Sequence, residues 1–105
     1  MKFLITESKM EQVVFNYLDN QDFVNIEGVK VVYFANSSDD KYAQIKFDKN
    51  DGLCFINFDL VKEISSFFSL QIPDSKKVIS KWVENTLQMK VTYTYQQAVR
   101  VPIPG

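Results

Sequence analysis

The sequence predicts an α+β domain, mainly β, in which an N-terminal helix precedes five antiparallel strands and a helical hairpin follows the third strand. Three observations lead to this prediction. Short runs rich in Val, Ile, Phe and Tyr fill residues 29–58, apolar residues recur at helical spacing in residues 8–20 and 59–88, and strict alternation returns in residues 89–96. Because no linker, repeat or low-complexity segment divides the chain, we expect a single domain over residues 1–105.

The first helix is expected over residues 8–20. Ser8 and Glu11 have the spacing of a capping box, in which two side chains satisfy amide groups at a helix start. Five apolar residues form one stripe along this helix: Met10, Val13, Val14, Tyr17 and Leu18. We expect the stripe to pack against the sheet, and residues 23–26 favour a short strand after it.

Residues 29–58 are predicted to form a three-stranded antiparallel meander. Its runs are residues 29–35, 42–47 and 53–58. The first has apolar residues on both faces, which indicates a strand covered on both sides. The second alternates, which predicts that Ala43, Ile45 and Phe47 share the buried face. Residues 48–52 can close a tight hairpin because they include Asn, Asp and Gly.

The helical hairpin is predicted over residues 59–88. Asp59 can cap its first helix, and Pro73 ends that helix because proline disfavours helical geometry in the residue before it. Residues 89–104 supply the last two strands. The first of these alternates cleanly, and the second is restricted to a sheet edge because Pro102 lacks an amide donor.

Composition narrows the classes of function. Twelve basic and thirteen acidic residues are interspersed and give a net charge of −1, so no broad electrostatic field attracts nucleic acid or an anionic membrane. The chain has no histidine, and its three glycines form no phosphate-binding loop. Cys54, the only cysteine, lies in an apolar run, which predicts a buried, unreactive thiol in a reducing compartment. We therefore expect no catalysis, no cofactor and no metal site.

Two short patterns point to a more specific function. Residues 45–50 read Ile-Lys-Phe-Asp-Lys-Asn and are followed by Leu53, and residues 99–101 read Val-Arg-Val. Together with the order of the predicted elements, these patterns resemble the two signatures of the Sm-like family of RNA-binding ring proteins. The resemblance implies a strongly bent five-stranded barrel. It also implies a homo-oligomeric ring, in which the fourth strand of one subunit pairs with the fifth strand of the next.

The resemblance further implies weak, non-catalytic binding of single-stranded RNA or DNA through Asp48, Lys49, Asn50 and Arg100. In this arrangement Asp48 orders the loop, Asn50 hydrogen-bonds a base edge, and Arg100 stacks on or pairs with a base. This chain has Lys49 where the family usually places a stacking ring, and Val101 where it has glycine. For such a site to form, the turn around Asn50 must lie beside the turn around Arg100.

Two alternatives stay open. A protein-interaction or virion-associated module would use the aromatic residues Phe67 and Phe68 beside Trp82 as an interface. A metal-dependent nuclease would instead use Asp48 and Asp51 to hold the ion.

The sequence also bears on location. The apolar run at the N-terminus is too short for an export signal, and no later run approaches the eighteen or so residues of a membrane span. We therefore expect a cytoplasmic protein with no membrane partner. Residues 1–9 are similar to the start of many small tailed-phage proteins, which implies a possible phage origin and the host cytoplasm as its compartment.

Overall fold

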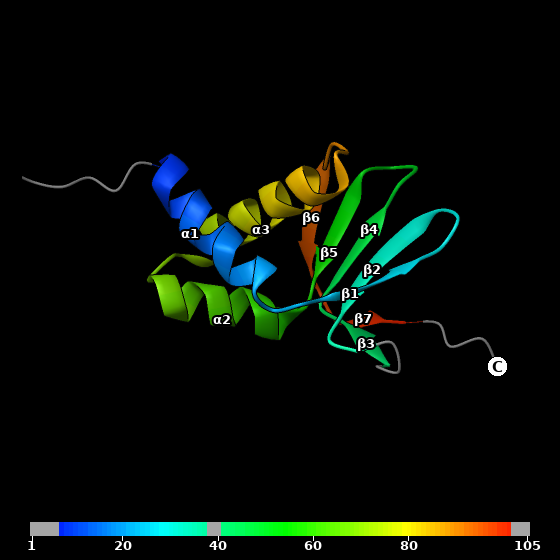
Figure 1. Ribbon diagram of the computed structural model, residues 1–105, viewed down its shortest axis with the longest axis horizontal. Helices are drawn as coiled ribbons and strands as arrows, with labels where there is room; N and C mark the ends of the chain where they lie inside the picture. The colour runs from blue at the N-terminus through cyan, green and yellow to red at the C-terminus, as the bar shows by residue number, and fades with distance from the viewer. Residues whose placement is uncertain (1–6, 38–40, 102–105) are drawn as a thin grey trace, which may run out of the picture.

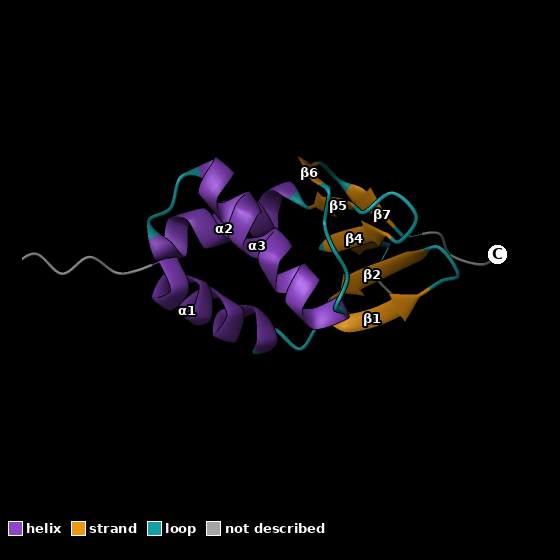
Figure 2. Ribbon diagram, turned by 90° about the horizontal axis from the view of Figure 1, so that it is seen from above, coloured by secondary structure: helices purple, strands orange, loops and turns teal. Residues whose placement is uncertain are grey.

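The structure, a computed structural model, describes residues 7–37 and 41–101, with side chains from residue 9 onward. Three helices cover one face of a five-stranded sheet, and a two-stranded ribbon lies against the other face near one end (Figures 1 and 2). In chain order the elements are α1 (Glu7–Asp19), β1 (Val24–Glu27), β2 (Val31–Ala35), β3 (Tyr42–Ala43), β4 (Ile45–Asp48), β5 (Leu53–Ile56), α2 (Phe58–Phe68), α3 (Ile72–Leu87), β6 (Tyr93–Gln96) and β7 (Val99–Arg100).

The predicted antiparallel barrel is wrong, because the main sheet stays open. Its strand order is β1-β2-β4-β5-β6, and the pair β5–β6 is parallel while the other three pairs are antiparallel. The cause is the helical hairpin, which is present as α2 and α3. It brings the chain back to the start of β5, where the amide of Thr92 donates to the carbonyl of Gly52 at 2.8 Å. A strand that begins beside the start of its neighbour runs parallel to it.

A break at Gln44 divides the second run of the predicted meander. The amide of Gln44 donates to the carbonyl of Phe34, and its carbonyl accepts from the amide of Asn57, both at 2.8 Å. Ile45 then faces the helices, whereas Ala43 is buried against the opposite face of the sheet. The expectation that Ala43, Ile45 and Phe47 share one face is therefore wrong for Ala43.

The last predicted strand does not join the main sheet. Its described part, β7, pairs with β3 in an antiparallel ribbon, with Tyr42 opposite Arg100 and Ala43 opposite Val99. Pro102 lies outside the described residues. β7 thus has a partner within its own chain, which leaves the ring hypothesis without the barrel on which it was based.

The helix boundaries depend on different residues from those expected. Ser8 lies inside α1 and not at the capping position before it. α2 is capped by Asn57, whose Oδ1 accepts from the amide of Asp59 at 2.9 Å. α2 ends at Ser69, which adopts a left-handed conformation with φ of 53°. Pro73 therefore does not end this helix. It lies in the first turn of α3, where its missing N–H removes no hydrogen bond.

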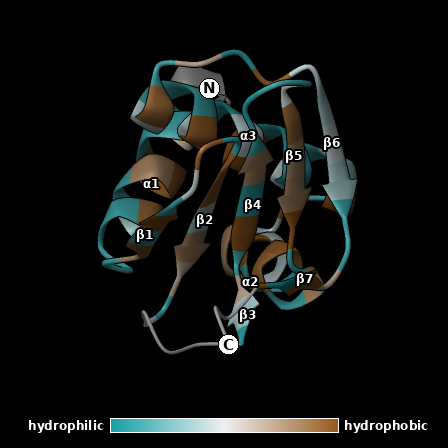
Figure 3. Cartoon of the chain, turned by 90° about the vertical axis from the view of Figure 1, so that its right-hand side faces the viewer, coloured by the Kyte–Doolittle hydropathy of each residue, from teal (hydrophilic) through white to brown (hydrophobic). Residues whose placement is uncertain are grey.

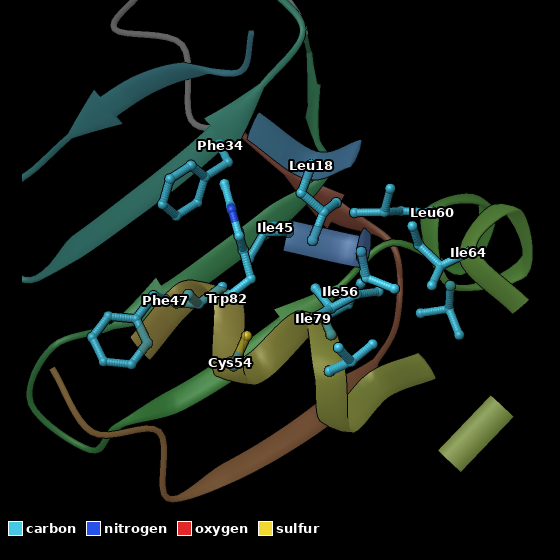
Figure 4. Close-up of a cluster of buried hydrophobic side chains, with 14 of the residues drawn as sticks. Leu18, Phe34, Ile45, Phe47, Cys54, Ile56, Leu60, Ile64, Ile79 and Trp82 are labelled. Carbon is cyan, nitrogen blue, oxygen red and sulfur yellow. The ribbon is translucent and has the colours of Figure 1, made fainter. Parts of the chain in front are cut away.

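The main core lies between the helices and the sheet and is centred on Trp82 (Figure 4). Trp82 is 4% exposed, and its rings lie 5.8 Å from the ring of Phe23 and 5.2 Å from that of Phe34, measured between centroids. Its indole N–H donates to Oδ1 of Asp19 at 2.9 Å, so the one polar atom of the side chain is satisfied. Trp82 is thus a core residue that joins α1, α3 and β2.

A second, smaller cluster lies beneath the ribbon on the other face of the sheet. It consists of Tyr33, Ala35, Ala43, Val99 and Val101. The ribbon therefore covers one end of this face and leaves the rest open (Figure 3). Because β2 contributes to both clusters, the prediction that it is covered on both faces is confirmed.

We expect Gly52→Ala to lower the free energy of unfolding by about 1–3 kcal/mol. Gly52 has φ of +71°, and an added Cβ would lie 2.9 Å from Oγ1 of Thr92 and 3.1 Å from the carbonyl oxygen of Lys90. The matched control is Gly28→Ala, whose Cβ meets only the carbonyl of Val31 at 3.4 Å. Urea denaturation of both variants checks this, and equal effects at the two positions would contradict it.

Candidate functional site

Three of the predicted site residues lie in the turn between β4 and β5. Oδ1 of Asp48 accepts from the amides of Asn50 at 2.9 Å and Asp51 at 3.3 Å, which orders the turn. Nζ of Lys49 pairs with Oε1 of Glu27 at 3.0 Å, so this cation is already engaged by the adjacent hairpin. Of the three, Asn50 is exposed, whereas Asp48 and Lys49 are half-buried.

Arg100 lies at the opposite end of the sheet from this turn. It is paired with Tyr42 in the ribbon, whereas Asp48 ends β4. Figure 1 shows the ribbon of β3 and β7 at the lower end of the sheet and the turn between β4 and β5 at the upper end. The expectation that the two turns lie side by side is wrong, and no site that joins Asn50 to Arg100 exists.

The open face of the sheet assembles a different group of side chains. The strand register places one row across four strands: Tyr33, Lys46, Phe55 and Tyr95. Tyr33 is buried under the ribbon, whereas Tyr95 is 42% exposed. In the next row Tyr93 lies opposite Leu53 and is 61% exposed. Figure 3 looks onto this face, with the ribbon at its lower end.

Three rings on this face form what we call the aromatic strip: Phe55, Tyr93 and Tyr95. The rings of Phe55 and Tyr95 are stacked, with centroids 5.3 Å apart and planes at 17°. The centroids of Tyr93 and Tyr95 are 4.9 Å apart. Nζ of Lys46 lies 5.3 Å from the centroid of Phe55, which is within the range of a cation–π interaction. The strip therefore combines exposed π surfaces with an adjacent cation.

Sequence reasoning missed the strip as a functional site. The alternation of residues 89–96 already places Tyr93 and Tyr95 on one face. The sequence did not indicate that β6 lies parallel to β5, and this pairing places Phe55 directly beside Tyr95.

Two features of the described residues bear on catalytic chemistry. The described ranges contain no group of three or more His, Cys, Asp or Glu side chains that could hold a metal ion. Cys54 is fully buried, and this burial raises the pKa of its thiol to about 12 despite a hydrogen bond with Ser80 that lowers it. The prediction of a buried thiol is confirmed, and its raised pKa makes it a poor nucleophile.

Comparisons with known proteins identify no relative. No protein-family model matches the chain, and no curated protein and no solved structure gives a match. Within the part of the chain that the structure describes, none of the helices has the length and apolar character needed to cross a membrane.

We expect the stability of the fold to fall at alkaline pH. The thiol of Cys54 loses its proton near pH 9.0 in the unfolded chain but near 12 in the folded chain. Above about pH 9 the unfolded state therefore binds fewer protons, and the free energy of unfolding falls by at most about 1.4 kcal/mol per pH unit from this group. The contribution of the protonated Cys54 thiol to the free energy of unfolding is fully present below about pH 9 and is lost as the pH rises toward 12.

Urea denaturation of the wild type and of Cys54→Ala between pH 7 and 10.5 checks this expectation. The variant should be less stable at pH 7, because it leaves a cavity, but its stability should depend less on pH. An equal alkaline slope in the two proteins would show that Cys54 does not titrate as described.

Proposed function

We propose that the protein binds single-stranded RNA or DNA on the open face of its sheet, without catalysing a reaction. The observation that carries this proposal is the aromatic strip, in which Tyr93 extends the stacked pair of Phe55 and Tyr95 and both tyrosines are exposed. Unpaired bases stack on aromatic side chains, and every base has a π face, so such a surface binds with little sequence preference.

The spacing of the strip suits successive bases. Tyr93 and Tyr95 are two residues apart on one strand, which separates their Cα atoms by roughly 7 Å along β6. Aromatic residues on neighbouring strands of an open sheet stack two or three bases in known RNA-binding modules. The strip offers this arrangement on β5 and β6.

Three cations accompany the strip. Lys46 lies over Phe55, the exposed Lys90 precedes β6, and the exposed Arg100 follows it in the ribbon. A single-stranded nucleic acid that runs along β6 would meet a cation at each end of the strand and a third cation near its middle. Because the chain carries a net charge of −1, we expect few phosphate contacts and modest affinity.

This proposal replaces the loop site expected from the sequence. Arg100 keeps a role as a phosphate contact. The turn that holds Asn50 also holds Gly52, and a Cβ on Gly52 would lie 3.1 Å from the carbonyl of Lys90, so this turn lies next to Lys90. Lys49 has no part in it, because it is paired with Glu27.

An interface built on Trp82 is not supported, because Trp82 is buried and its N–H is satisfied within the chain. Phe67 is 68% exposed on α2 and packs beside Tyr17 and Phe68. It therefore serves as the matched control for the aromatic strip.

We expect Tyr95→Leu to weaken oligonucleotide binding by about five- to a hundredfold, since stacking of one base contributes about 1–3 kcal/mol. Fluorescence anisotropy with labelled U-rich and A-rich oligonucleotides at low salt measures this. Phe67→Leu removes a ring that is more exposed than Tyr95 from the helical layer and should leave affinity unchanged. The proposal fails if no oligonucleotide binds, or if the two variants weaken binding equally.

We expect Arg100→Ala to reduce the dependence of binding on salt. Removal of one phosphate contact should lower the slope of log affinity against log salt concentration by about 1. Titrations at several salt concentrations measure the slope, and Lys62→Ala, at an exposed lysine on α2, is the control. An unchanged slope for Arg100→Ala would remove Arg100 from the binding surface.

A further inference from the structure

A groove of about 500 Å³ lies between α3 and β6, on the side of β6 away from β5. α3 contributes Lys76, Lys77 and Lys81 to its lining, and β6 and the residue before it contribute Thr92, Tyr93 and Thr94. Figure 1 shows α3 beside the edge strand β6. The groove is thus walled by a helix on one side and by a strand edge on the other.

The strand wall offers backbone hydrogen-bonding groups. At the end of β6, the amide of Gln97 donates to the carbonyl of Ile56 of β5 at 2.9 Å. Backbone groups alternate in direction along a strand, so those of Tyr93 and Tyr95 also point toward β5, and those of Thr94 and Gln96 point toward the opposite edge. Among the described residues, no strand pairs with this edge. Just before β6, the amide of Val91 donates to Oε2 of Glu84 on α3 at 2.9 Å, which holds the start of the strand against the helix.

The helix wall is positively charged. Three lysines line the groove against one acidic residue, Glu84, whose carboxylate is engaged by the amide of Val91. Lys81 also pairs with Glu11 of α1. The half-buried Lys76 and the exposed Lys77 lie about one turn nearer to the start of α3. The local charge therefore favours an acidic occupant.

We propose that an extended acidic segment of a partner protein binds in this groove as an additional strand on β6. Its main chain pairs with the backbone groups of Thr94 and Gln96, and its carboxylates lie against Lys76 and Lys77. Strand addition beside a helix is a common mode of peptide recognition, in which the main chain provides affinity and the groove provides specificity.

A second copy of this chain fits the groove less well. The segment that would pair there, residues 89–96, carries Lys90 and no acidic residue. Self-pairing would bring a further cation to a groove that already holds three lysines. Charge complementarity thus favours a partner of another sequence over a dimer.

The peptide groove is distinct from the aromatic strip. The strip uses the side chains of Tyr93 and Tyr95 on the open face, whereas the groove uses the backbone groups of Thr94 and Gln96 and the lysines of α3. Tyr95→Leu should therefore weaken oligonucleotide binding but leave peptide binding within about twofold, because strand pairing depends on the main chain.

The test uses a fluorescein-labelled eight-residue peptide that alternates valine and glutamate, titrated with the full chain at low salt. We expect the double variant Lys76→Gln/Lys77→Gln to bind at least about fivefold more weakly, because it removes two cations from the groove. The control is Lys62→Gln, which removes an exposed lysine from α2 and should bind as the wild type does.

Two further probes decide whether the peptide pairs with the strand edge. A peptide of the same sequence with alternate amides N-methylated, on the edge that faces β6, should lose binding, and a valine–lysine peptide should not bind. Hydrogen exchange followed by NMR should show protection of the amides of Thr94 and Gln96 on addition of the first peptide. The proposal is overturned if the N-methylated or the basic peptide binds as tightly as the acidic peptide, or if the acidic peptide does not bind. A dimer that forms through β6, detected by sedimentation, would also overturn it.

Discussion

The parallel pairing of β5 with β6 is the constraint on which the rest of the structure depends. It requires the chain to return across the sheet between the two strands, and the hairpin of α2 and α3 makes that return. The same hairpin supplies Trp82, Ile79 and Val83 to the core, so the helices that bring the chain to β6 also build the core. Because β6 occupies the last position in the sheet, the sheet has an edge and does not close.

The core explains why β6 stays in this position. Ser80 on α3 donates its hydroxyl proton to the carbonyl of Lys76 at 2.8 Å and also bonds with the hydroxyl of Thr94 on β6. Glu84, one turn further along α3, accepts from the amide of Val91. Two side chains on one face of α3 thus fix both the start and the middle of the strand. Buried hydroxyl and carboxylate groups that are satisfied in this way specify one arrangement of helix and strand.

An edge strand that is long, exposed and uncharged favours aggregation. β6 avoids some of these properties but not all of them. It is short, and the lysines of α3 lie along its edge. Its two tyrosines nevertheless expose a large aromatic area on the open face, where no element of the described chain covers them. The proposed nucleic-acid surface and the proposed peptide groove are therefore the two sides of a single strand. The first depends on its side chains and the second on its main chain.

Local patterns in the chain were enough to predict most of the helices and strands. They predicted the N-terminal helix, the strands of the meander, the helical hairpin and the alternation of residues 89–96, because these depend on local periodicity and on turn residues. They also predicted that Cys54 is buried. The tertiary structure alone decided that β6 pairs with β5, that Gln44 divides a strand, and that Arg100 and Asn50 lie at opposite ends of the sheet. Pairing between distant strands depends on how the helices pack between them, and no local pattern in the chain encodes that packing.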